Sequence, residues 1–214
     1  ADNDGGAILV DDESALSIDR STFINNTAGA DGGAIMSGVT DFVFTSVRNS
    51  TLTQNRAGRH GGAVYSHQHG VAFENSTVVA NTAVGNGGGY HADSYYGYFY
   101  NTILAGNSAN GSSSDASADC YAGSNQLHAA GSNLLGQSTG CQATRYDLTL
   151  QVGSLFTNVL QPLADNGGAL LPDNTRPQSY ALRPGSPAID AGNRDFCPVY
   201  DQTGSLRFNG NGCD

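Results

Sequence analysis

The side chains best suited to acid–base or metal chemistry lie in two short runs that are 26 residues apart. Each run carries them at alternate positions: Tyr65, His67 and His69 in the first, then His91, Asp93 and Tyr95 in the second. Neutral imidazole is a common ligand of zinc and copper, and histidine or tyrosine can transfer a proton to or from a substrate. Alternate residues of a strand share one face, so these groups meet only if the fold places the two runs side by side.

Composition excludes several classes of protein. The chain has 214 residues, a net charge of -10 and nine basic residues, all of them arginine. Such a charge argues against a nucleic-acid binder, and the lack of lysine excludes Schiff-base chemistry and a P-loop. No apolar run approaches the roughly 20 residues that a membrane-spanning helix needs. The length favours one domain.

Two sequence markers repeat along the first half with a period of 26–29 residues. Glycine pairs open four segments at Gly5-Gly6, Gly32-Gly33, Gly61-Gly62 and Gly87-Gly88, and an asparagine recurs in the same phase at Asn26, Asn55, Asn81 and Asn107. The units contain no amphipathic stretch long enough for a helix and no leucine framework. About three short strands per unit, joined by glycine and asparagine turns, predict the coils of an all-β parallel β-helix, a solenoid in which each strand pairs with its counterpart one coil on.

This stacking predicts which side chains are neighbours. The four asparagines form one column, in which each amide hydrogen-bonds the next. On the outside of the solenoid, His67 lies beside Asp93, Tyr65 beside His91 and His69 beside Tyr95. The inner face of the same strands carries Ile35, Val64 and Tyr90.

Three interpretations of this exterior patch remain open. The first is a solvated outer face with no chemistry. The second is a zinc or copper site with four ligands: His67, His69, His91 and Asp93. The third is a polysaccharide-degrading groove, in which Tyr65, His67 or His91 transfers a proton and Arg59 neutralises a uronate carboxylate. The negative net charge opposes the third, because it repels an anionic polysaccharide.

Calcium is a further candidate ligand. Asp2, Asp4 and the acidic run 11–13 could bind it, although the chain contains no 12-residue EF-hand pattern. None of these interpretations requires a cofactor for folding.

Four cysteines lie in the second half, at positions 120, 141, 197 and 213. They form no CxxC pair and no zinc-finger spacing, so an even count in this acidic chain predicts two disulfides and an oxidising compartment. Proximity favours Cys120–Cys141 and Cys197–Cys213, although three pairings are formally open.

The first half resembles the GGA(I/V) and FxxN repeats of polymorphic outer-membrane proteins, with Phe23-Ile-Asn-Asn26 as the best match. The second half resembles the bacterial surface proteins called choice-of-anchor Q domain proteins, through Gly131-Ser-Asn-Leu-Leu-Gly136, Leu182-Arg-Pro-Gly-Ser-Pro-Ala-Ile-Asp-Ala-Gly192 and Cys197-Pro-Val-Tyr-Asp-Gln202. These resemblances imply a right-handed parallel β-helix that is exported and often tethered to the cell surface. They imply no reaction.

We therefore expect one β-helix domain over 1–214, with regular coils at 1–109, irregular coils at 110–171 and a capping segment at 172–214. The leading function is a secreted or cell-surface module with a structural and adhesive, non-catalytic role. The alternatives are a polysaccharide lyase or glycoside hydrolase and a metal-binding surface protein. Expected partners are an extracellular glycan, a host or cell-surface ligand, or a second copy that associates end to end or through a strand edge.

Overall fold

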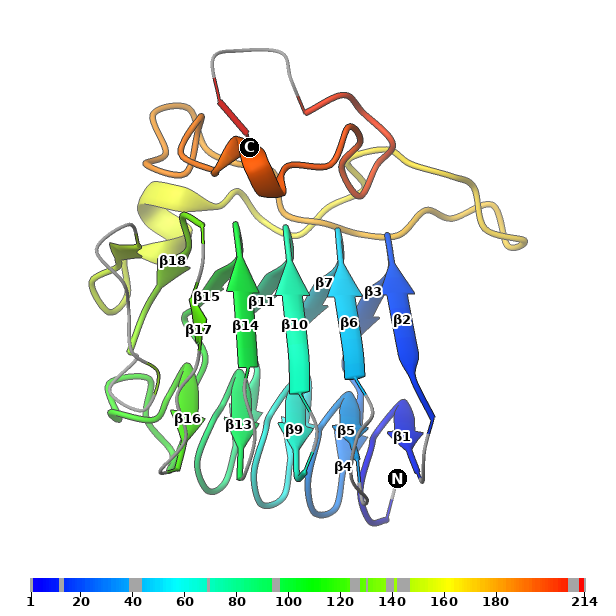
Figure 1. The fold of residues 1–214 in the computed structure, drawn as a ribbon, viewed down its shortest axis with the longest axis vertical. Helices are drawn as coiled ribbons and strands as arrows, with labels where there is room; N and C mark the ends of the chain where they lie inside the picture. Colours follow the sequence, from blue (N-terminus) through cyan, green and yellow to red (C-terminus); the bar gives the residue numbers. More distant parts are fainter. Residues whose placement is uncertain are drawn as a thin grey trace.

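A computed structural model describes residues 2–11, 14–38, 44–68, 70–93, 97–123, 128–129, 131–137, 141, 147–207 and 212–213. The described chain is all-β apart from two short helical turns, and its strands form parallel sheets along a solenoid (Figure 1). The predicted fold class, an all-β parallel β-helix, is confirmed.

The strands follow one another coil by coil. The first three coils hold β1 (Ile8–Val10), β2 (Leu16–Asp19), β3 (Thr22–Ile24) and β4 (Thr27–Ala28), then β5 (Ile35–Ser37), β6 (Phe44–Arg48), β7 (Thr51–Thr53) and β8 (Arg56–Ala57), then β9 (Val64–Ser66), β10 (Gly70–Glu74), β11 (Thr77–Val79) and β12 (Thr82–Ala83). The later strands are β13 (Tyr90–Ala92), β14 (Gly97–Tyr100), β15 (Ile103–Ala105), β16 (Cys120–Ala122), β17 (His128–Ala129), β18 (Leu134–Leu135) and β19 (Leu148–Thr149). The two-residue strands β4, β8 and β12 are additional to the three strands per coil that the sequence predicts.

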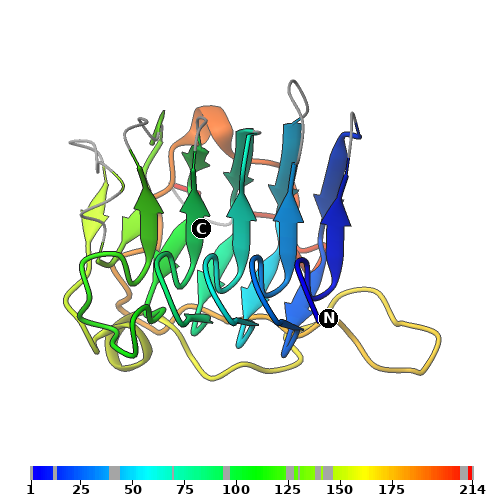
Figure 2. The same ribbon diagram turned by 90° about the horizontal axis from the view of Figure 1, so that it is seen from below.

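Four parallel sheets run along the solenoid. Sheet A has the order β1-β5-β9-β13-β16, sheet B β17-β14-β10-β6-β2, sheet C β19-β18-β15-β11-β7-β3 and sheet D β12-β8-β4. Sheets A and B face the viewer in Figure 1, and Figure 2 shows the coils side by side from below. Every strand of a sheet therefore comes from a different coil, so residues about 26–29 apart become neighbours.

The glycine pairs are required at the corner before sheet A. Gly32, Gly61 and Gly87 have φ values of +68°, +67° and +68°, a region that favours glycine. The second glycine of the pair lies where two coils approach closely, because a Cβ on Gly33 would lie 2.0 Å from the carbonyl oxygen of Gly62. Both members of the pair are thus needed for the coils to stack.

The core fills the inside of the solenoid with side chains stacked in register. Ile35, Val64 and Tyr90 pair across sheet A and are fully buried. From sheet B, the rings of Phe73 and Phe99 stack with centroids 5.4 Å apart. Inward side chains thus stack on like side chains, as the parity of the sequence predicts.

The recurring asparagines form one hydrogen-bonded column. The Nδ2 atoms of Asn26, Asn55 and Asn81 each donate to the Oδ1 of the next asparagine at 2.9 Å. The column ends where Asn107 donates from Nδ2 to Asp119 Oδ1 at 2.8 Å. Each Oδ1 also accepts the backbone N–H of the preceding asparagine, so corner amides that join no strand ladder are satisfied.

A second column was not predicted. The backbone N–H groups of Ser50, Ser76 and Thr102 donate, respectively, to the side chains of Ser76, Thr102 and Asn133, and the column ends where Asn133 donates to Asp147. Its sequence signal is an Asn-Ser or Asn-Thr pair that recurs every 26 residues, at 49–50, 75–76 and 101–102.

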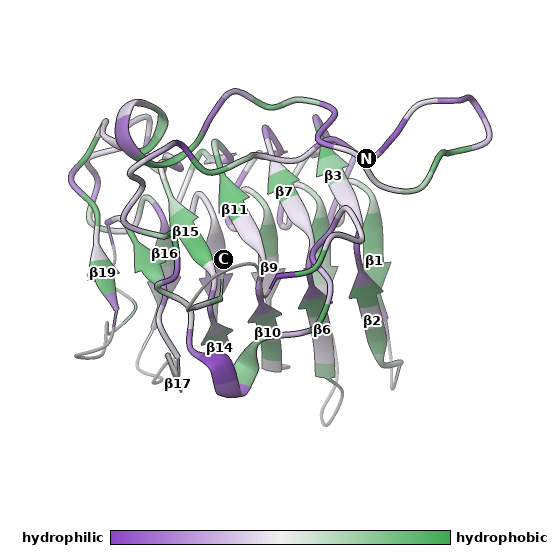
Figure 3. Ribbon diagram, turned by 90° about the horizontal axis from the view of Figure 1, so that it is seen from above, coloured by the Kyte–Doolittle hydropathy of each residue, from purple (hydrophilic) through white to green (hydrophobic). Residues whose placement is uncertain are grey.

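The C-terminal segment, residues 160–207, runs along the outside of sheet C (Figures 1 and 3). Thr22 donates to the carbonyl oxygen of Gln178 at 2.7 Å, and Thr51 donates to the side chain of Gln202 at 2.6 Å. Thr53 and Tyr180 share a hydrogen bond between their hydroxyls at 2.9 Å. The segment thus covers the outer face of sheet C over several coils.

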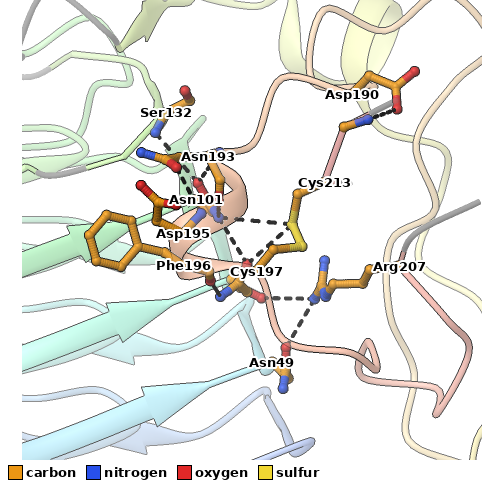
Figure 4. Close-up of a disulfide and its surroundings, with 12 residues drawn as sticks. Asn49, Asn101, Ser132, Asp190, Asn193, Asp195, Phe196, Cys197, Arg207 and Cys213 are labelled. Atoms are coloured by element: carbon orange, nitrogen blue, oxygen red, sulfur yellow. Dashed lines mark hydrogen bonds between the residues drawn. A yellow bond between two sulfur atoms is a disulfide. The ribbon is translucent and has the colours of Figure 1, made fainter. Parts of the chain in front are cut away.

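Two disulfides hold the irregular parts. Cys120 pairs with Cys141 and Cys197 with Cys213. Beside the second bridge, Asn101 Nδ2 donates to the carbonyl oxygen of Asn193 at 2.9 Å, and Arg207 donates to Asn49 at 3.0 Å (Figure 4). The bridge therefore lies where the C-terminal segment meets the corner between sheets B and C.

The asparagine column gives a stability prediction. In an Asn81→Ala variant, the backbone N–H and Nδ2 of Asn55 lose their acceptor, and the buried carbonyl of Leu52 loses a donor. We expect a loss of at least about 3 kcal/mol in the free energy of unfolding, measured by urea denaturation. Asn158→Ala, at an exposed asparagine, is the matched control and should cost less than about 0.5 kcal/mol. Equal losses in the two variants would contradict the role of the column.

Candidate functional site

The outer face of sheet A carries a different large side chain on each coil. In register along the sheet, Leu9 is followed by Met36, Tyr65, His91 and Tyr121. The asparagine column, by contrast, repeats the same residue on successive coils. The outer face of sheet A contains the predicted site residues of β9 and β13.

Asp93, just after β13, is the centre of the cluster. Its carboxylate accepts hydrogen bonds from the Tyr65 hydroxyl, from His91 Nε2 at 2.7 Å and from His67 Nδ1 at 3.2 Å. Burial acts to raise the pKa of Asp93, but the hydrogen bonds from Tyr65, His91 and His67 outweigh it and hold that pKa below its usual value. The carboxylate is therefore ionised at neutral pH.

His91 is enclosed in a stack of rings. Its ring lies 5.1 Å from Tyr65 and 4.7 Å from Tyr121, centroid to centroid, and His60 from the preceding coil's turn packs against it at 4.6 Å. Only 3% of His91 is exposed. Burial lowers the pKa of His91, so its imidazole is neutral and donates from Nε2 to Asp93.

The expectation of a solvent-exposed patch is wrong for two of its members. Tyr65 and His91 point outward from sheet A, yet they are 6% and 3% exposed. The reason is lateral packing, because the rings of Tyr65 and His91 stack on each other, and His60 and Tyr121 also pack against His91. Burial, together with its bond to Asp93, raises the pKa of Tyr65. The phenol thus stays protonated and acts as a donor.

His67 is the more accessible imidazole, with 39% of its side chain exposed. Because Asp93 is ionised, His67 Nδ1 carries the proton in their hydrogen bond, and Nε2 is the nitrogen with a lone pair. A carboxylate-bound imidazole of this kind can accept a proton or ligate a metal through Nε2.

Arg59 has a structural partner. Its Nε lies 3.0 Å from Asp31 Oδ1, and its terminal nitrogen also pairs with Asp31, which is 3% exposed. Asp31 further accepts the backbone N–H of His60 at 2.9 Å. The guanidinium proposed to neutralise a uronate therefore already compensates a buried carboxylate.

These groups line a shallow depression of about 500 Å³. Its lining consists of Asp31, Arg59, His60, Tyr65, His67, Asn86, His91, Asp93 and Tyr121. Sequence reasoning missed Asp31, Asn86 and Tyr121 and left His60 without a role.

The sequence did contain a signal for three of these four residues. Asp31, His60 and Asn86 each precede a glycine pair, and so does Asp4. In the structure, the backbone N–H of each donates to the side chain of the one before it in the chain, at 2.9–3.0 Å. The residue before the glycine pair is thus another inter-coil column, and it forms one edge of the depression.

The predicted metal site stays a prediction. Within the residues that the structure describes, no group of three histidine, cysteine or acidic side chains is placed to hold a metal ion. His69 and Tyr95 lie outside the described residues, as do residues 12 and 13 of the acidic run considered for calcium. Of the four predicted zinc or copper ligands, the structure brings together His67, His91 and Asp93 by direct hydrogen bonds.

Comparison with known proteins gives one match. Residues 20–38, which cover β3, β4 and β5, match the Chlamydia polymorphic membrane protein repeat. Searches of curated proteins and of solved structures found no match for the chain. The resemblance of the second half to choice-of-anchor Q domain proteins therefore stays a prediction.

The repeat match and the β-helix fold together indicate a surface-protein structural module. The two disulfides indicate an oxidising compartment. Among the described residues, no helix has the length and apolar character to cross a membrane.

The buried imidazole predicts a pH dependence of stability. The pKa of His91 is lower in the folded chain than in the unfolded chain. Below the ordinary histidine pKa of about 6.5, the unfolded chain therefore binds a proton at His91 that the folded chain does not bind. Acidification thus destabilises the fold. His91→Met introduces the residue that stands two coils earlier in the same column, Met36. The variant should show a smaller change of the unfolding free energy with pH, and the difference should be at most about 1.4 kcal/mol per pH unit. Urea denaturation of both proteins between pH 7 and 5.5 measures it, and equal slopes would contradict the prediction.

Proposed function

We propose that this chain is an extracellular surface module with an adhesive role, whose sheet A depression contacts a glycan or another cell-surface ligand. The match to a surface-protein repeat, the rigid solenoid and the disulfides support the location. The observation that carries the role is the convergence of Tyr65, His67 and His91 on Asp93.

The outer face of sheet A is a place where the repeat varies. The turns, the core and the asparagine column repeat because stacking requires them. Nothing in the stacking of coils requires the change from Met36 to Tyr65, His91 and Tyr121 along sheet A. Polar and aromatic groups gathered at such a place are typical of binding sites.

The geometry favours binding for a second reason. The side chains around Asp93 are held by hydrogen bonds and ring stacking, so little side-chain entropy is lost when a ligand binds. The partly exposed His67 and Tyr121 lie at the rim and supply the contacts.

Binding to surfaces tests this proposal. We expect the labelled protein to bind cells or a glycan array, and His67→Ala and Tyr121→Ala to weaken that binding about tenfold, because these two side chains supply direct contacts to the ligand. Arg56→Ala removes an exposed side chain on sheet D and should leave binding unchanged. Wild-type binding that neither sheet A variant affects would exclude the depression as the contact site.

A carbohydrate-active enzyme is the second candidate. The hydrogen bond between His67 and Asp93 favours it, because a carboxylate-bound imidazole is suited to general base catalysis. Two observations oppose a lyase that acts on uronates, namely the pairing of Arg59 with Asp31 and the net charge of -10.

Turnover separates the two candidates. The protein is incubated at pH 7 with a uronate polymer and with neutral polysaccharides, and the products are followed by the absorbance of unsaturated ends and by reducing sugar. The adhesive proposal predicts no product from either. Product formation that His67→Ala reduces by at least about 100-fold would instead establish an enzyme, since general acid–base catalysis contributes at least that much.

A further inference from the structure

The outer face of sheet B carries a second group of rings, away from the sheet A depression. Across the sheet, Ser46 of β6, Ala72 of β10, Tyr98 of β14 and His128 of β17 are in register. The first two are small, and the last two stack with centroids 5.5 Å apart and planes 18° apart. The face thus changes from small to aromatic along the solenoid.

Small residues on β10 let the rings of neighbouring strands meet. Phe44 lies beside Gly70, which has no side chain, and Ala72 lies beside Tyr98. The rings of Phe44 and Tyr98 therefore reach across β10 to a centroid distance of 6.0 Å. A larger residue at position 70 or 72 would separate them.

Two more rings extend this surface toward the C-terminal segment. Tyr100 lies parallel to Tyr98, with planes 4° apart and centroids 6.3 Å apart. Phe196, in the short helix Arg194–Phe196, packs on Tyr100 at 4.6 Å. We refer to Phe44, Tyr98, Tyr100, His128 and Phe196 together as the aromatic shelf.

The shelf is accessible. Phe44 and Phe196 are 43% and 40% exposed, His128 is exposed, and the two tyrosines are half-buried. The C-terminal segment covers sheet C, whereas in Figure 1 it passes above the ends of β2, β6, β10 and β14 and not across their outer face. Packing against this segment thus accounts for Phe196 and Tyr100, whereas Phe44 and Tyr98 contact each other across β10.

Charged groups border the shelf in alternating sign. Asp19, Arg48 and Glu74 occupy successive coils of sheet B in register, next to Tyr100. They supply hydrogen-bond donors and acceptors without a net positive charge. Among these described border residues Arg48 lies between two carboxylates, so a polyanion would meet a net negative border on a chain whose charge is -10.

We propose that the aromatic shelf binds a neutral oligosaccharide. The nearly parallel rings of Tyr98, Tyr100 and His128 match the C–H face of a pyranose, whose hydroxyl edges reach the alternating charges of the border. The tilted rings of Phe44 and Phe196 flank them. Five rings, two of them half-buried, are small for a protein partner, since a stable protein interface covers about 800 Å² on each side. The inference rests on the proposed function, the binding of surface ligands, and adds to the sheet A depression a second contact surface with its own class of ligand.

Titration with defined sugars tests the shelf. The probes are cellohexaose, xylohexaose and mannohexaose, with a hexamer of galacturonate as the anionic comparison. Because the chain has no tryptophan, tyrosine fluorescence and calorimetry report binding. We expect at least one neutral hexamer to bind and the anionic hexamer to bind at least about tenfold more weakly.

Variants locate the site. Tyr98→Ala and Phe44→Ala should weaken binding of the neutral hexamer at least about tenfold, whereas Tyr98→Phe, which keeps the ring, should stay within about threefold of wild type. Val84→Ala removes an apolar side chain that is 53% exposed outside the shelf and serves as the matched control. Thermal unfolding verifies that each variant is folded.

The outcomes distinguish this inference from the proposed function. If no neutral hexamer binds, or if Tyr98→Ala and Phe44→Ala bind like wild type, the inference is overturned. If the protein still binds cells and His67→Ala alone removes that binding, the adhesive proposal stands without the shelf. If a neutral hexamer binds through Tyr98 while cell binding is absent, the shelf is supported and the adhesive role is not.

Discussion

The structure depends on hydrogen bonds between successive coils at the corners, where the backbone belongs to no strand. Within the sheets, backbone groups pair with the next coil without help from side chains. At three corners, a side chain on one coil accepts a backbone N–H from an adjacent coil: the asparagine column, the serine and threonine column, and the residues that precede the glycine pairs. A buried N–H without such an acceptor is costly, so the register of the whole solenoid is set at these positions.

The direction of these bonds explains how the columns end. In the asparagine column, each residue accepts from the coil before it and donates to the coil after it. The last member of a column accepts hydrogen bonds from N–H groups, but it has no further member to which it could donate. A carboxylate, which only accepts, therefore suits this position better than an amide. Asp119 ends the asparagine column, and Asp147 ends the serine and threonine column. Burial raises the pKa of Asp119 to about 6 even though Asn107 and the backbone of Gln137 donate to it.

The sequence predicted the fold and the pairing of His67 with Asp93 for a single reason. Glycine and asparagine markers give the register, and alternation along a strand then gives the face. Burial of the site could not be predicted in this way, because it depends on how the rings of His60 and Tyr121 pack on His91 and how His91 stacks on Tyr65. The path of the C-terminal segment could not be predicted either, since Tyr180 and Gln202 contact Thr53 and Thr51 across more than 120 residues without any repeat to align them.

The same physics explains why the outer faces can carry chemistry. In a solenoid each outward side chain contacts mainly the coils above and below, so a change there is constrained by two neighbours and not by a whole core. The order Asp19, Arg48, Glu74 on sheet B shows this constraint, because like charges directly opposite each other would be destabilising. On sheet C the outer positions are occupied by the C-terminal segment. Rings and ionisable groups therefore gather on the outer faces of sheets A and B, where stacking with one neighbouring coil is enough to hold them in place.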